Sequence, residues 1–182
     1  GDYGAVMEVD FAADACGSVD VAWDVRPVNE TVAQDPEWLQ VEQDYEQDLS
    51  AQLDQEVGTA TEALGREQLG YLSADALRGH FGADLGWMNG GGVREDLGAG
   101  PVTLRELHAI HPYSNTGVLV EVTGAQLVAA LNQGADSNPG GSGGFPRPSG
   151  FTFAYSPDAP RGERISTVEL EDGTPVEAEE TY

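Results

Sequence analysis

The chain has 182 residues, and its 32 acidic residues against 8 arginines and no lysine give a net charge of −24. This length allows one ordinary domain, or one domain with a piece of another. So negative a surface argues against a nucleic-acid partner, because the phosphates would be repelled, and against an anionic membrane surface. The apolar runs are too short for a membrane-spanning helix.

The charge pattern also bears on the environment. A surface rich in carboxylates repels itself in dilute buffer and tolerates high salt. We therefore expect a halophilic protein, the alternative being an acidic protein from a mesophile with a GC-rich genome. The single cysteine, Cys16, excludes an internal disulfide.

The first 28 residues have the pattern of a β-hairpin. Residues 5–11 and 19–25 alternate apolar and polar side chains, and residues 12–18 between them contain Asp14 and Gly17. Because two strands alone are rarely stable in water, the pattern predicts that they belong to a domain that precedes residue 1.

A long helix is predicted next, from Pro36 to Val57. Asp35 suits its N-cap, Pro36 its first turn, and Gly58 its end. Its apolar stripe consists of Trp38, Val41, Tyr45, Leu49, Leu53 and Val57. Its other face is strongly acidic, which suggests a connector between domains.

The remainder interleaves helices and strands without strict alternation. Helices are predicted at 70–81, 103–109 and 123–132, strands at 84–88, 117–122, 151–155 and 165–170, and a loop at 138–149. Thr103 and Thr123 are candidate caps. The fold class expected is α/β (α+β), a mixed sheet with packed helices.

The stretch Asn89-Gly90-Gly91-Gly92-Val93-Arg94 carries the clearest chemistry. Consecutive glycines allow backbone amides to approach a ligand. Asn89 offers a donor and an acceptor, and Arg94 offers a planar fork for phosphate or carboxylate. The alternative is a tight turn whose arginine makes a surface ion pair. No Gly-Lys-Ser/Thr follows, so it is not a P-loop.

This stretch, with the segments around it, resembles the C-terminal domain of the 5′-nucleotidase family. Besides Asn-Gly-Gly-Gly-Val-Arg at 89–94, the matching segments, in the family's order, are Gly-Tyr-Leu-Ser-Ala-Asp-Ala at 70–76, Gly-Pro-Val-Thr at 100–103, His-Pro-Tyr-Ser-Asn-Thr at 111–116 and Val-Glu-Val-Thr-Gly at 120–124. The resemblance covers roughly residues 60–182, and several motifs in order are more specific than any one of them.

The resemblance implies a two-domain enzyme, in which an N-terminal metallophosphoesterase domain binds two divalent metal ions and performs the hydrolysis. Residues 1–33 would then be the terminal strands of that domain, 34–58 an interdomain linker helix, and 59–182 the C-terminal domain, incomplete at its end. None of the metal-domain motifs is in the chain, so we expect a fragment with no catalytic residue, metal or cofactor of its own.

The resemblance also implies the substrate-binding residues. Asn89 matches the family's base-contacting asparagine, and Arg94 its phosphate-side arginine. Tyr113 stands where the family has a phenylalanine that stacks on the base, although the residues alone favour a core aromatic. Arg66 matches another phosphate-side arginine, in a register uncertain by one position. Gly91 and Gly92 complete the predicted set.

Other polar residues receive simpler interpretations. His108 and His111 have a His-x-x-His spacing that can bind zinc, but no third ligand is near in sequence, which favours loop or surface roles. His80 is interpreted as a favourable charge at a helix end. Asp136, Asp158 and Asp172 are interpreted as solvated loop charges.

The function expected is the substrate-binding part of a phosphoesterase that hydrolyses nucleoside 5′-phosphates. Its partners would be a nucleotide or nucleoside and its own N-terminal metallophosphoesterase domain. UDP-sugars or 2′,3′-cyclic nucleotides are alternative substrates, and a stand-alone ligand-binding or interaction domain is the non-catalytic alternative. The family implies an extracellular or cell-surface location, although no signal peptide is found in the chain.

Overall fold

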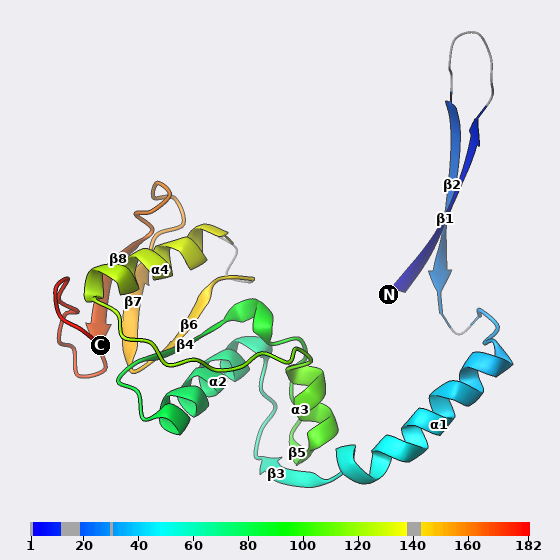
Figure 1. Cartoon of the computed structure of the whole chain (residues 1–182), viewed down its shortest axis with the longest axis horizontal. Coiled ribbons are helices and arrows are strands. Elements are labelled where there is room, and N and C mark those ends of the chain that lie inside the picture. Colours follow the sequence, from blue (N-terminus) through cyan, green and yellow to red (C-terminus); the bar gives the residue numbers. More distant parts are fainter. Residues whose placement is uncertain (1, 12–18, 30, 138–142) are drawn as a thin grey trace. The chain divides into compact units, whose positions relative to one another are not determined.

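The computed structural model describes residues 2–11, 19–29, 31–137 and 143–182 (Figure 1). For 2–11 and 19–28 it describes the backbone alone. The chain divides into two compact units, residues 1–50 and 51–182. In the described part, no helix is both long and apolar enough to cross a membrane.

The first unit contains the predicted hairpin. Strand β1 (Asp2–Phe11) pairs antiparallel with β2 (Val19–Val28), with Asp2 opposite Val28 and Phe11 opposite Val19. The hairpin is thus confirmed, while its predicted turn and Cys16 lie outside the described residues.

Helix α1 (Pro36–Leu53) begins where the sequence predicts. The N–H of Glu37 donates to Asp35 Oδ1 at 2.9 Å, so Asp35 caps the helix. The helix ends four residues before the predicted end, because Val57 belongs to strand β3 (Glu56–Ala60). None of its residues is buried, and Trp38 of the apolar stripe is 72 % exposed.

The second unit contains the remaining elements. They are β3, α2 (Arg66–Phe81), β4 (Gly86–Asn89), a 3₁₀ turn (Gly90–Gly92), β5 (Gly100–Thr103), α3 (Leu104–Ile110), α4 (Gly124–Ser137), β6 (Pro146–Ser149), β7 (Phe151–Tyr155) and β8 (Ile165–Leu170). Over the whole described chain the strands pair antiparallel as β1–β2, β3–β5, β4–β6 and β7–β8. The α/β class is therefore confirmed, with its strands in small antiparallel sheets rather than in one mixed sheet.

Two hydrophobic clusters form the core of this unit. One lies between α4 and the β7–β8 pair, and it consists of Leu127, Leu131, Ala135, Phe145, Phe151, Ile165 and Val168. The other joins α2, the segment after the 3₁₀ turn, β5 and α3, and it consists of Leu69, Val93, Leu97, Val102 and Ile110. The second cluster supports the Asn89–Arg94 segment.

Several element predictions are corrected. Helix α2 starts four residues earlier than predicted, at Arg66. The strand predicted at 84–88 is β4, 86–89, and its side chains are exposed or half-buried rather than buried. The predicted loop 138–149 ends in strand β6, and strands β3 and β5 were not predicted. Helices α3 and α4 and strands β7 and β8 are confirmed, α4 extending five residues further.

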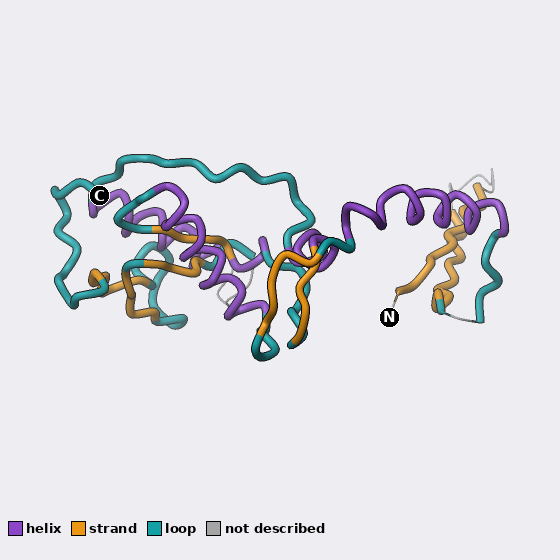
Figure 2. Tube along the Cα trace, turned by 90° about the horizontal axis from the view of Figure 1, so that it is seen from below, coloured by secondary structure: helices purple, strands orange, loops and turns teal. Residues whose placement is uncertain are grey.

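The strand predicted at 117–122 is wrong. This segment runs as part of the long loop that follows α3 (Figure 2). Within the described residues only its last member has a backbone partner: Val122 and Tyr182 exchange N–H···O bonds of 3.1 and 3.0 Å. Val118, Leu119 and Val120 are 77, 62 and 64 % exposed. The alternation is present, but no strand among the described residues pairs with residues 117–121.

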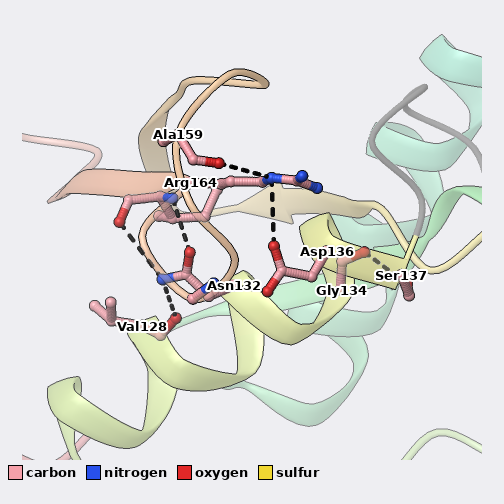
Figure 3. Close-up of polar contacts among 9 residues, drawn as sticks. Val128, Asn132, Gly134, Asp136, Ser137, Ala159 and Arg164 are labelled. Carbon is pink, nitrogen blue, oxygen red and sulfur yellow. Dashed lines mark hydrogen bonds and ion pairs between the residues drawn. The ribbon is translucent and has the colours of Figure 1, made fainter.

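Asp136 is also corrected. It lies in α4 rather than in a loop, its side chain is only 8 % exposed, and its Oδ1 lies 3.4 Å from Arg164 Nε (Figure 3). The N–H of Gly162 donates to its Oδ2 at 2.7 Å. One turn earlier, Asn132 accepts from the N–H of Ile165 at 2.9 Å. These contacts fasten residues 162–165 to α4.

Candidate functional site

The Asn-Gly-Gly-Gly segment is hydrogen-bonded to the backbone just before β6. Strand β4 ends at Asn89, and the 3₁₀ turn Gly90–Gly92 follows. The N–H of Gly90 donates to the carbonyl of Phe145 at 2.8 Å, and the N–H of Gly91 donates to the carbonyl of Gly143 at 2.7 Å. These two amides are thus engaged within the protein.

Close packing requires glycine at 91, where a Cβ would meet backbone, whereas a Cβ at 92 would meet the flexible end of the Met88 side chain. A Cβ at Gly91 would lie 2.9 Å from the Cα of Gly143, and a Cβ at Gly92 would lie 2.6 Å from Cε of Met88 and 3.3 Å from Oδ1 of Asn89. Since the contact at Gly91 is with backbone, a side chain there would displace the turn. The segment therefore adopts a compact path that a bulkier sequence could not follow.

The residues after the turn alternate between core and surface. Val93 is 2 % exposed and belongs to the second core cluster. The next residue, Arg94, is exposed, and its N–H donates to the carbonyl of Ile110 at 2.9 Å. Because Val93 anchors the backbone, the exposed side chain of Arg94 starts from a fixed point.

His111 connects three segments of the site. Its Nδ1 lies 3.3 Å from the carbonyl oxygen of Gly92, and its Nε2 lies 3.0 Å from Oγ of Ser73 in α2. The ring is half-buried. The sequence alone assigned His111 no more than a loop or surface role. The missed contacts join residues 19 and 38 positions apart, for which the sequence carries no local signal.

Tyr113 and Arg66 stand at the edges of this arrangement. Tyr113 follows His111 by two residues and is 52 % exposed, so it is a surface aromatic rather than a core one. Arg66 is the first residue of α2; its N–H donates to Oδ1 of Asp96 at 2.9 Å, and its Nε lies 3.9 Å from the same oxygen. Asp96 follows Arg94 by two residues, so both arginines belong to neighbouring segments.

The predicted site residues thus lie on segments joined by hydrogen bonds, from His111 to Gly92, from Arg94 to Ile110 and from Arg66 to Asp96. A cavity of about 390 Å³ lies elsewhere, lined by Arg78, Gly150, Glu171 and Tyr182 among others, and by none of the predicted site residues. Among the residues that the structure describes, no group of three histidine, cysteine or carboxylate side chains could hold a metal ion.

The fold and this segment are those of a nucleotidase C-terminal domain. The family model for "5′-nucleotidase, C-terminal domain" matches residues 45–182, and the chain belongs to this family of phosphoesterases. Among relatives, the trifunctional nucleotide phosphoesterase YfkN of Bacillus subtilis is 28 % identical over 91 % of the chain. The cell wall protein Lmo0130 of Listeria monocytogenes is 34 % identical over 63 % of it.

A solved structure shows the same likeness. The 5′-nucleotidase precursor of Thermus thermophilus matches 98 % of the chain with a TM-score of 0.77 and 27 % identity. The chain spans only 38 % of that structure, 13 % of YfkN and 16 % of Lmo0130. The match concerns one part of longer proteins.

Proposed function

We propose that this chain is the substrate-binding part of a phosphoesterase that hydrolyses nucleoside 5′-phosphates, acting in nucleotide catabolism. The observation that carries the proposal is the arrangement of Arg94 and Tyr113. Both are exposed. The N–H of Arg94 donates to the carbonyl of Ile110, and Tyr113 follows by two residues His111, whose ring contacts the carbonyl of Gly92. An arginine suits the phosphate, and an aromatic face suits the base.

The remaining residues complete the proposed assignment. Asn89 would contact the base, Gly91 and Gly92 would set the path of the loop, and Arg66 would add positive charge at the start of α2, where a helix N-terminus also favours anions. The catalytic metals and their domain would lie outside this chain, and UDP-sugars or 2′,3′-cyclic nucleotides remain alternative substrates. The names of two relatives, a 5′-nucleotidase precursor and a cell wall protein, support an extracellular or cell-surface location.

Binding of AMP and adenosine to the purified chain tests this proposal. Each of Arg94→Ala and Tyr113→Ala is titrated with both ligands by NMR or calorimetry in molar salt. Arg94→Ala should weaken AMP by about tenfold or more, the usual size of a charge-assisted hydrogen bond, and leave adenosine nearly unchanged. Tyr113→Ala should weaken both ligands about equally, because a base stacks in either case.

Matched controls separate the site from general effects. Arg161 is an exposed arginine of the loop before β8, and Tyr45 is an exposed tyrosine of α1. Arg161→Ala and Tyr45→Ala should leave both affinities unchanged. Equal loss of AMP and adenosine on Arg94→Ala would remove Arg94 from the phosphate role. Absence of binding by the unmodified chain would favour the non-catalytic interaction domain.

A further inference from the structure

Residues 117–122 are fixed at both ends and open between them (Figure 2). At one end, a Cβ on Gly117 would lie 2.7 Å from Cε2 of Phe81, so the backbone passes close to α2. At the other end, Val122 packs against the first core cluster and exchanges two backbone hydrogen bonds with Tyr182. Among the described residues, no backbone group is hydrogen-bonded to the backbone of residues 118–121.

This open part exposes three consecutive apolar side chains. Val118, Leu119 and Val120 are 77, 62 and 64 % exposed, and Glu121 after them is exposed as well. β-branched residues favour strand backbone, and a strand whose backbone groups are unpaired is a template for another strand. The segment therefore has the side chains and the available backbone groups of a strand edge.

The contacts of Tyr182 already begin a ladder along this edge. Thr123 and Thr181 form an isolated antiparallel bridge. The N–H of Val122 donates to the carbonyl of Tyr182 at 3.1 Å, and the N–H of Tyr182 donates to the carbonyl of Val122 at 3.0 Å. A pair that exchanges both bonds is the hydrogen-bonded position of an antiparallel ladder, and such positions recur at every second residue. The next such positions toward residue 117 are therefore 120 and 118.

We propose that residues 118–121 are the docking edge for an antiparallel strand, and that its occupant is the polypeptide of a longer protein beyond Tyr182. A strand that continues from Tyr182 passes each residue of this edge in turn, and its second and fourth residues exchange backbone hydrogen bonds with Val120 and Val118. The Thermus structure that the chain matches is longer than the chain, which spans 38 % of it. The inference goes beyond the proposed function and does not depend on it.

Charge and tethering favour this occupant over a second copy of the chain. A second copy brings a net charge of −24 to a surface of the same sign, and the two copies repel each other. A strand that continues from Tyr182 is already held beside the edge, so its pairing is intramolecular and has a high effective concentration.

The edge also defines the chemistry of the occupant. In an extended strand, Val118 and Val120 share a face with Val122, which packs against the core. The residues opposite them, the second and fourth after Tyr182, should therefore be apolar or β-branched. The first residue lies opposite Glu121, where a basic or neutral polar side chain fits and an acidic one does not.

Two chains that carry five further residues after Tyr182 test the proposal. One extension is Lys-Val-Thr-Val-Thr, which places valine at the second and fourth positions. The other is Lys-Pro-Thr-Pro-Thr, which has the same length and charge but lacks the two N–H groups that would donate to the carbonyls of Val120 and Val118. Amide hydrogen exchange of both chains and of the unextended chain is measured by NMR in molar NaCl, at two protein concentrations.

The expected result is an alternating pattern of protection. With the valine extension, exchange at the amides of Val118 and Val120 should slow by about tenfold. The amides of Leu119 and Glu121 should change little, because their N–H groups point away from the added strand. With the proline extension, all four amides should exchange as fast as in the unextended chain.

Three other results would each overturn the proposal. Equal exchange with the two extensions would mean that residues 118–121 do not accept a strand through their backbone. Protection of Leu119 and Glu121 instead would mean that the register of Tyr182 does not continue. Protection that appears without an extension and increases with protein concentration would assign the edge to a second copy.

Discussion

Asp136 and Arg164 form the most deeply buried ion pair among the described residues. Their side chains are 8 and 14 % exposed. Arg164 Nε also donates to the carbonyl of Ala159 at 3.3 Å, whereas its Nη1 is buried with no hydrogen-bond partner among the described groups (Figure 3). A buried charge that loses its partner is costly because nothing replaces the lost water. The pair therefore makes the loop before β8 depend on α4.

Replacing the carboxylate should destabilise the second unit. Asp136→Ala leaves Arg164 buried without its counter-charge and should lower the free energy of unfolding by about 3 kcal/mol, measured by urea denaturation. Asp158→Ala, at an exposed aspartate of the same loop, is the control and should change it by less than about 0.5 kcal/mol. Equal effects of the two substitutions would mean that the pair contributes nothing beyond surface charge.

Asp172 gives a prediction for acid pH. The N–H of Thr174 donates to its Oδ1 at 2.9 Å, and this bond, followed by the Thr174 hydroxyl, holds the pKa of Asp172 below its ordinary value. Because the pKa of Asp172 is lower in the folded chain than in the unfolded chain, where it is about 3.9, the ionised carboxylate stabilises the fold above that pH. This stabilisation is lost as the pH falls through the pKa of the folded state.

Carbon-13 NMR titration of the Asp172 carboxyl measures this directly. We expect its midpoint below the ordinary value, and Thr174→Ala should raise it only part of the way, because the backbone bond remains. Thr167→Ala, at an exposed threonine of β8, should not move it. A midpoint unchanged by Thr174→Ala would assign the whole effect to the backbone N–H.

At the level of elements, α3 shows why some of the fold can be predicted from sequence. Its start is a reciprocal capping box: the Thr103 N–H donates to Glu106 Oε2 at 2.8 Å, and the Glu106 N–H donates to Thr103 Oγ1 at 3.4 Å. The determinants lie within four residues, so the sequence suffices. The caps of α1 and α4 by Asp35 and Thr123 follow the same logic.

The capping box should be measurable in the stability of the second unit. Thr103→Ala keeps the bond from the Thr103 N–H but removes the hydroxyl, which accepts from the Glu106 N–H and donates to Glu106 Oε2 at 3.1 Å. It should cost about 1 kcal/mol, with faster amide exchange in α3. Thr152→Ala, at an exposed threonine of β7, is the control for loss of a threonine in a regular element. Unchanged exchange in α3 would show that core packing of Ile110, rather than the cap, holds the helix.

Elements whose determinants are distant in sequence were missed. Residues 117–122 have strand-like alternation, yet a strand needs a neighbour, and the described residues provide one only at Val122. Strand β6 contains Pro146 and Pro148, which suggest a loop, but both lie opposite β4 residues, Asn89 and Trp87. Prolines are tolerated in short edge pairings such as this one.

The residues of the candidate site also differ in whether the sequence alone can identify them. Asn89, Gly91, Gly92 and Arg94 are adjacent in sequence, so a motif can identify them, and whether they bind a nucleotide stays a prediction. His111 contacts Ser73, which lies 38 positions earlier, and buried Asp136 pairs with Arg164. Neither pairing can be read from polarity or spacing, because both arise from how α2 and α4 pack.

At the scale of the whole molecule, the net charge of −24 dominates. Thirty-two acidic groups face eight arginines, of which Arg66, Arg78, Arg105, Arg147 and Arg164 each lie within 4 Å of a carboxylate in the described structure. The uncompensated carboxylates repel one another and favour expansion of the chain at low salt. The same field opposes an approaching nucleotide, so ligand affinity should be higher in concentrated salt than in dilute buffer.

We therefore expect the melting temperature to rise from dilute buffer to molar NaCl, by about 10 °C, or about 3 kcal/mol for a chain of this size. The shape of the curve distinguishes the two interpretations of the composition. Simple screening is mostly complete near 0.1 M, where the Debye length has already fallen to about 10 Å, so an acidic mesophilic protein should reach a plateau early. A halophilic protein should continue to gain stability up to molar concentrations.

The measurement uses NaCl because sulfate and phosphate strengthen the burial of apolar surface in any protein. A near-neutral protein melted in parallel controls for the effect of the salt itself. If the melting temperature reaches a plateau at low salt, or does not rise, the carboxylate-rich surface is not a halophilic adaptation.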